Sequence, residues 1–163
     1  MHIYYPQSLA AKAEALELFS VEKQLTNSHN GKVNLQLSND SLLALKHMSI
    51  RTMLSKESAN QLAMRLSLSL PAPAVVKSKP YWTISQVLQS ALPAELTCEG
   101  DRFLVKDSTV VKLDLAKESV QASFSDLVSS VLGVKGPGDA LQFLNALQPL
   151  LMEFLLLDGF SVS

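Results

Sequence analysis

Apolar residues recur at helical spacing along most of the chain. Leu9, Ala13 and Leu16 fall on one face of a predicted helix over 8–19, and Ser8 is placed to cap it. The same kind of pattern predicts further helices after Asn39-Asp40-Ser41, after Ser55, from Thr83 to Leu92, and from Ser125 to Leu132.

One more helix is predicted from Asp139, its expected cap, to about Leu157. Pro149 lies inside it and should kink it, because proline has no N–H to donate to the preceding turn. Gly159 is placed as its C-terminal stop. The most apolar run, Pro149–Leu157, is far shorter than the roughly 20 residues that a membrane span needs, so we expect no membrane partner. The first residues also lack the pattern of a signal peptide.

Strand-like alternation occurs in two places. Val33, Leu35 and Leu37 alternate with polar residues, which predicts a short half-buried strand. Residues 102–106 and 109–115 alternate in the same way around a short polar turn, which predicts a β-hairpin. Helices and strands do not alternate regularly, so the pattern favours an α+β fold of mixed helices, short strands and one hairpin.

The prolines between Leu70 and Tyr81 force an extended backbone. This stretch contains no glycine, and we interpret residues 71–80 as an ordered connector. The chain is therefore expected to divide into residues 1–70, the connector, and residues 81–163.

The amino-acid composition excludes several classes of protein. Of the 163 residues, 47 % are hydrophobic and only 18 % are charged, which excludes intrinsic disorder and suggests that part of the surface is covered by a partner. The net charge of −1 gives no sign of the excess of positive charge that a protein needs to bind nucleic acid by itself. The single cysteine, Cys98, excludes a disulfide scaffold, and we interpret it as a reduced, unreactive thiol.

The sequence contains no recognisable catalytic, phosphate-binding or metal-binding motif. The glycines form no phosphate-binding loop, no Gly-x-Ser-x-Gly elbow is present, and the three histidines are scattered. Tyr4-Tyr5 and Tyr81-Trp82 are expected to pack rather than to stack on bases. The sequence therefore predicts no catalytic residue, no metal site and no cofactor held by this chain.

Three motifs in order resemble the largest subunits of multisubunit RNA polymerases. Tyr5-Pro6-Gln7-Ser8 with Ala13-Glu14 resembles the segment that follows the family's metal-binding aspartates. Leu70-Pro71-Ala72-Pro73-Ala74 with Lys79-Pro80-Tyr81-Trp82-Thr83 resembles its "PxPAI–KPxPLWTGKQ" stretch. Lys135-Gly136-Pro137, Leu155-Leu156 and Gly159-Phe160-Ser161 resemble its "KGP … WLL … GFS" end.

Four further segments resemble the plant-specific members of this family, polymerase V more than polymerase IV. They are 2–8, 17–24, 100–105 and 147–153. The resemblance implies a nuclear DNA-directed RNA polymerase that makes non-coding RNA for RNA-directed DNA methylation.

The resemblance also divides the chain: residues 1–70 hold the end of the active-site region and the first half of the pore domain, and residues 81–163 the second half, up to the funnel. The aspartates that hold the catalytic Mg²⁺ would lie upstream, so the chain alone is expected to be inactive. Implied partners are the second-largest subunit, the small shared eighth subunit, and the nucleotide and RNA 3′ end in the secondary channel.

Two departures from the family affect the expected channel. Where the family reads GIVQDTLLG, residues 36–44 read QLSNDSLLA, so Asn39 replaces a glutamine while Asp40 remains. Where the family reads KKTVG, residues 117–121 read KESVQ, so Glu118 replaces a lysine. Lys32, Asn39, Asp40 and Lys117 are the channel-lining candidates. The acidic Glu118 should weaken the handling of backtracked RNA, unless the loop has simply moved.

Two other hypotheses stay open on the sequence alone. The chain could be a free-standing interaction module, derived from such a subunit, that binds polymerase partners through apolar faces. An unrelated small α+β enzyme is the third possibility, which the missing motifs disfavour.

Overall fold

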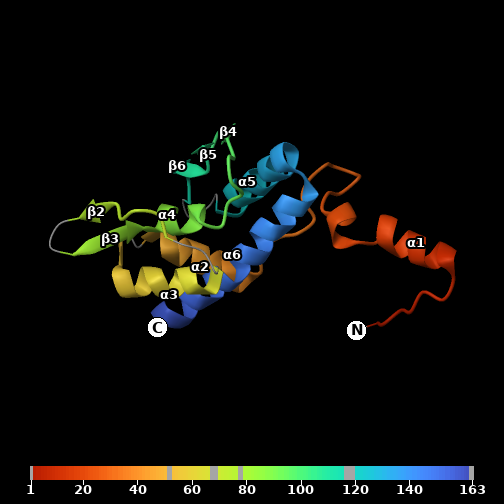
Figure 1. The fold of residues 1–163 in the computed structure, drawn as a ribbon, viewed down its shortest axis with the longest axis horizontal. Helices are drawn as coiled ribbons and strands as arrows, with labels where there is room; N and C mark the ends of the chain where they lie inside the picture. The colour runs from red at the N-terminus through yellow and green to blue at the C-terminus, as the bar shows by residue number, and fades with distance from the viewer. Residues whose placement is uncertain (1, 51–52, 67–69, 77–78, 116–119, 162–163) are drawn as a thin grey trace. The chain divides into compact units, whose positions relative to one another are not determined.

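The computed structural model describes residues 2–50, 53–66, 70–76, 79–115 and 120–161. The chain forms two compact units, residues 1–36 and residues 37–163 (Figure 1). In its described residues the larger unit combines five helices with two small antiparallel sheets, which confirms the predicted α+β class. The predicted division at 71–80 stays a prediction.

The first unit contains one α-helix and a looped segment. Helix α1 (Leu9–Glu17) begins at the predicted cap, where the Ser8 hydroxyl accepts the Ala11 N–H at 3.1 Å. A 3-10 helix, η1 (Val21–Gln24), follows. The strand predicted over 33–37 is wrong, because Val33 makes only an isolated bridge to Thr26 and no ladder continues from it.

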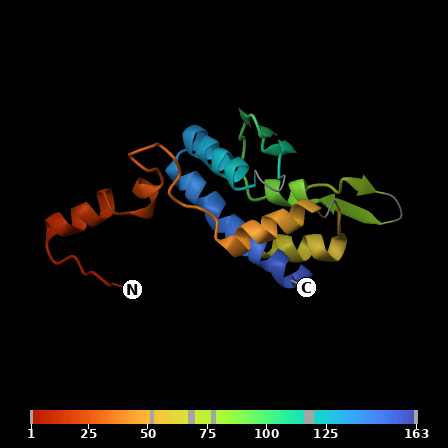
Figure 2. The ribbon, with the colours of Figure 1, turned by 180° about the vertical axis from the view of Figure 1, so that it is seen from behind.

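Helix α6 (Pro137–Asp158) is the central element of the second unit. Helices α2 (Asn39–Ile50), α3 (Lys56–Leu66) and α5 (Val120–Lys135) all pack against it (Figures 1 and 2). Its inward face buries Ala140, Phe143, Leu147, Leu150, Leu151 and Phe154. Length and composition alone would let α6 cross a membrane, but here it serves as the core of the unit.

The ends of α6 are set by two glycines with left-handed backbone. Gly136, with φ 91°, is the N-cap and Pro137 begins the helix, so the predicted cap at Asp139 is wrong: Asp139 lies in the first turn. Gly159, with φ 71°, ends the helix as predicted, and its N–H donates to the Leu155 carbonyl at 2.9 Å. The helix continues through Pro149.

Two groups of polar side chains connect α6 to its neighbours, one to α3 and one to α2. The buried Glu153 carboxylate accepts the Nε–H of Arg65 at 2.8 Å and the amide of Gln61 at 3.2 Å, both from α3. Near the end of α6, Asp158 lies 2.8 Å from Nδ1 of His47 on α2. The His47 ring in turn makes an edge contact with Phe160, with ring centroids 5.8 Å apart.

The hairpin predicted near residues 102–115 is confirmed and has a third strand. Strands β4 (Cys98–Gly100), β5 (Phe103–Lys106) and β6 (Thr109–Leu113) form a sheet in that order. Asp107 and Ser108 form the turn with φ 46° and 59°. Two positive φ values are typical of the tight turns that join twisted strands.

A second sheet was not expected from the sequence. It consists of β1 (Met53–Ser55), β3 (Pro80–Thr83) and β2 (Val75–Val76), in that order and antiparallel. Each strand is too short for its alternation to be recognised.

The proline-rich stretch is fixed by hydrogen bonds to the residues that follow it. The Trp82 indole donates to the Pro71 carbonyl at 2.9 Å, and the Gln86 amide donates to the Ala72 carbonyl at 2.8 Å. Thr83 and Gln86 also form a capping box on α4 (Ile84–Gln89), which confirms the predicted cap. The buried Trp82 packs as expected, and Tyr81 is partly exposed.

The buried carboxylate on α6 gives a stability prediction. Arg65→Ala should lower the free energy of unfolding by about 1–3 kcal/mol, because Glu153 would stay buried with Gln61 as its remaining partner among the described residues. Urea denaturation of both proteins measures the change. Lys56→Ala, an exposed substitution on the same helix, is the matched control and should cost less than about 0.5 kcal/mol. Equal effects would show that the ion pair does not stabilise the fold.

Candidate channel-lining site

Lys32 projects from a tight loop in the first unit. The loop is closed by the Gly31 N–H on the Asn27 carbonyl and by the Asn27 N–H on the Lys32 carbonyl, both 2.8 Å. The Asn30 side chain accepts the Lys32 N–H at 3.0 Å. Gly31 adopts φ 67°, a backbone region that side chains disfavour. The backbone of Lys32 is therefore fixed while its side chain is exposed.

Asn39 and Asp40 are the first two residues of α2, and both are exposed. Ser38 caps this end of the helix: its hydroxyl accepts the Ser41 N–H at 3.3 Å and lies 2.9 Å from the Ser41 hydroxyl. An acidic side chain in the first turn is favoured by the helix dipole. Asp40 thus suits its position structurally, and its carboxylate remains accessible.

The four candidates fall in different parts of the chain. Lys32 belongs to residues 1–36, and Asn39 and Asp40 belong to residues 37–163. Lys117, like its neighbour Glu118, lies outside the described residues. A common channel face formed by the four residues stays a prediction.

A polar hollow lies at the start of α3. It is lined by Ser55, Lys56, Glu57, Lys79, Pro80 and Tyr81. Hydrogen bonds to its own N–H and to the Ser55 hydroxyl lower the pKa of Glu57, and the nearby Lys79 and Lys56 charges act in the same direction. The exposed Glu57 is therefore ionised at neutral pH, and the hollow carries charges of both signs.

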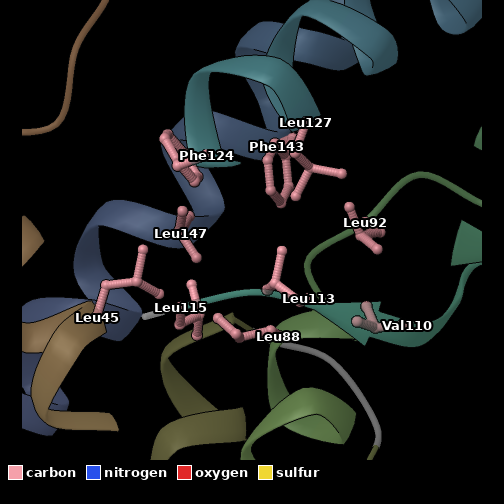
Figure 3. A pocket seen from close by; sticks show the side chains of 10 residues that line it. All are labelled: Leu45, Leu88, Leu92, Val110, Leu113, Leu115, Phe124, Leu127, Phe143 and Leu147. Carbon is pink, nitrogen blue, oxygen red and sulfur yellow. The ribbon is translucent and has the colours of Figure 1, made fainter. Parts of the chain in front are cut away.

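An apolar cavity of about 20 Å³ lies between the hairpin and the helices that pack against it. Figure 3 shows Leu45, Phe124, Phe143 and Leu147 of the helices facing Leu113 of β6 across it. This volume would hold about one water molecule, but an apolar lining offers that water no hydrogen bonds. The cavity is better explained as incomplete packing than as a ligand site.

The described residues include no group of three or more His, Cys, Asp or Glu side chains that could hold a metal ion. Cys98 lies buried on β4, and burial raises the pKa of its thiol. A thiol with a raised pKa has less of the reactive thiolate at neutral pH. This arrangement agrees with the interpretation of Cys98 as an unreactive thiol.

The polar residues that hold α2 and α3 against α6 belong to no recognisable sequence motif. Glu153 interrupts the apolar run Pro149–Leu157, and His47 is one of three scattered histidines. A charge inside such a run is a usable signal, because a buried carboxylate requires a partner. Its partners, Arg65 and Gln61, lie about 90 residues away in the sequence and carry no signal of their own.

Known proteins match the whole chain. A family model described as RNA polymerase Rpb1, domain 3, matches residues 24–163. Over its full length the chain is 51 % identical to DNA-directed RNA polymerase V subunit 1 of Arabidopsis thaliana, covering 8 % of that protein. It is 29 % identical, again over its full length, to the same plant's DNA-directed RNA polymerase IV subunit 1, covering 12 %.

More distant polymerases match as well. DNA-directed RNA polymerase II subunit RPB1-B of Trypanosoma brucei brucei is 31 % identical over 99 % of the chain, which covers 10 % of that protein. The chain thus belongs to the family of RNA polymerase largest subunits, and its residues 24–163 match their domain 3. It spans about a tenth of the length of these relatives.

The buried thiol gives a second prediction. At neutral pH, Cys98 in the folded chain should react with iodoacetamide at least about tenfold more slowly than in the chain unfolded by urea, because burial both shields the thiol and raises its pKa. Raising the pH should accelerate the reaction of the folded chain by increasing the thiolate fraction. Equal rates in the folded and unfolded chain would contradict the burial of Cys98.

Proposed function

We propose that this chain is the pore-region segment of the largest subunit of a plant DNA-directed RNA polymerase of the V type. The observation that carries this proposal is the 51 % identity over the full chain to polymerase V subunit 1, against 29 % to polymerase IV subunit 1. In this role the segment lines the secondary channel of a nuclear enzyme that makes non-coding RNA for RNA-directed DNA methylation.

The proposed channel contacts use Lys32, Asn39, Asp40 and Lys117. The exposure of the first three supports the proposal, since each can reach a molecule that passes through the channel. Lysine side chains suit RNA phosphates, and the carboxylate of Asp40 would repel them. The channel would therefore hold a nucleotide or an RNA 3′ end weakly enough for it to move.

The segment would not be catalytic by itself. Nucleotide addition needs a carboxylate cluster for Mg²⁺, and we propose that this cluster lies upstream of the residues present here. The contribution of this chain would be to shape the channel and to support the active-site region.

The proposed protein partners are the second-largest subunit and the small shared eighth subunit. The low charge content and the exposed apolar side chains support burial within a larger assembly. The alternative is a free-standing module that binds polymerase partners through the same faces.

Size-exclusion chromatography with light scattering tests the proposal on the isolated chain, with and without co-expressed second-largest and eighth subunits. We expect the folded chain alone to self-associate at high concentration and the co-expressed subunits to give a defined complex, because apolar surface would then be covered. A folded monomer that ignores both subunits would contradict the proposal and favour an independent module.

The departure at Glu118 gives a further prediction for the assembled polymerase. Glu118→Lys should increase cleavage of backtracked transcripts several-fold, because it restores positive charge beside the RNA phosphates. Glu99→Lys, an exposed change of the same charge on β4, is the matched control and should have no effect. Unchanged cleavage in the Glu118→Lys enzyme would show that this position does not contact RNA.

A further inference from the structure

The hollow at the start of α3 contains side chains that the proposed function does not use. It has a volume of about 280 Å³ and combines the aromatic ring of Tyr81 with the amines of Lys56 and Lys79 and the carboxylate of Glu57. None of the described channel candidates lines it. The hollow is therefore a separate candidate for binding.

The ring of Tyr81 belongs to the outer face of the sheet formed by β1, β3 and β2. Tyr81 is paired with Ser55 on one side and with Val75 on the other. Side chains alternate between the two faces of a strand, and the next residue, Trp82, is buried while Tyr81 is 37 % exposed. The family stretch KPxPLWTGKQ, which residues 79–83 resemble, has a leucine at this position. The exposed ring is therefore a feature of this chain rather than of the family pattern.

The charges around the hollow favour an anion. Two lysines and one glutamate give it a local net charge of +1. Glu57 is held at the start of α3, because its carboxylate accepts hydrogen bonds from its own N–H and from the Ser55 hydroxyl. Lys56 and Lys79 are exposed and form no ion pair with a described residue. Both amines are therefore available to a phosphate group.

We infer that this hollow binds a nucleotide unit, with the base stacked on Tyr81 and the phosphate held by Lys56 and Lys79. Every base has a π face, so stacking on an aromatic ring tolerates different bases. The Glu57 carboxylate can accept hydrogen bonds from ribose hydroxyls. Ligand pockets usually measure about 300–1,000 Å³, so the volume suits one nucleotide. The site is separate from the proposed channel contacts, so the inference goes beyond the proposed function.

Titration of a dilute, isotope-labelled sample of the chain, followed by NMR, tests the inference. The probes are AMP, adenosine without the phosphate, ribose 5-phosphate without the base, and a short adenylate RNA. AMP should shift the amide signals of residues 55–57 and of Tyr81. It should also bind at least about fivefold more tightly than adenosine or ribose 5-phosphate, because stacking and charge act together. Added salt should weaken the binding of AMP.

The RNA probe identifies the source of the nucleotide. Tighter binding of the RNA than of AMP would identify an RNA strand, and equal or weaker binding would identify a free nucleotide. The absence of any shift with AMP, or equal binding of AMP and one of its two fragments, would overturn the inference.

Two variants test the contacts separately. Tyr81→Leu, which introduces the family residue, should weaken the binding of AMP about fivefold or more and leave ribose 5-phosphate unchanged. Lys79→Gln should weaken the binding of both. Lys106→Gln, an exposed substitution in the hairpin, is the matched control and should change neither.

The indole N–H signal of Trp82 shows whether each variant keeps its fold, because this group donates to the Pro71 carbonyl beneath the sheet. A folded Tyr81→Leu chain that binds AMP as tightly as the unchanged chain would overturn the inference. A Lys79→Gln chain with unchanged binding of AMP would do the same.

Discussion

Burial of the inward face of α6 is the constraint on which the fold of residues 37–163 depends. Three helices pack against this face, and its apolar residues form much of the core of the unit. A helix this apolar could also slide or rotate against its neighbours. The Glu153 contacts to Arg65 and Gln61 set the register between α6 and α3, and the contact between Asp158 and His47 does the same for α2.

Residues 1–36 lack a comparable buried apolar face. Among residues 2–36, only Leu25 and Val33 are buried, and they lie in the looped segment rather than in α1. The two units therefore differ in their dependence on partners. Residues 37–163 bury a core of their own, while α1 needs a covering surface.

Local signals in the sequence predicted most helices but few of the contacts between them. Ser8, Thr83 and Gly159 were recognised because a cap depends on neighbouring residues. The alternation of residues 33–37 led to the prediction of a strand that the structure does not form. A strand also needs a neighbouring strand to pair with, and the alternation of its own residues does not reveal whether one is present. The sheet of β1, β3 and β2 was missed for the related reason that its pairing joins residues distant in the chain.

The candidate site could be predicted only through the resemblance to polymerases. Lys32, Asn39 and Asp40 carry no motif of their own, and their exposure alone would not separate them from other polar residues. The proposed arrangement of these residues around a channel would depend on parts of a polymerase outside these 163 residues. No local rule in the sequence could therefore specify it.

The central claim is that this chain works as part of a polymerase largest subunit. Purification of the endogenous protein with an antibody against residues 106–112, which lie exposed or half-exposed in the hairpin, followed by mass spectrometry, tests it most directly. The claim predicts a polypeptide many times longer than 163 residues that purifies with the second-largest polymerase subunit. A free 17.7 kDa chain without polymerase subunits would contradict it.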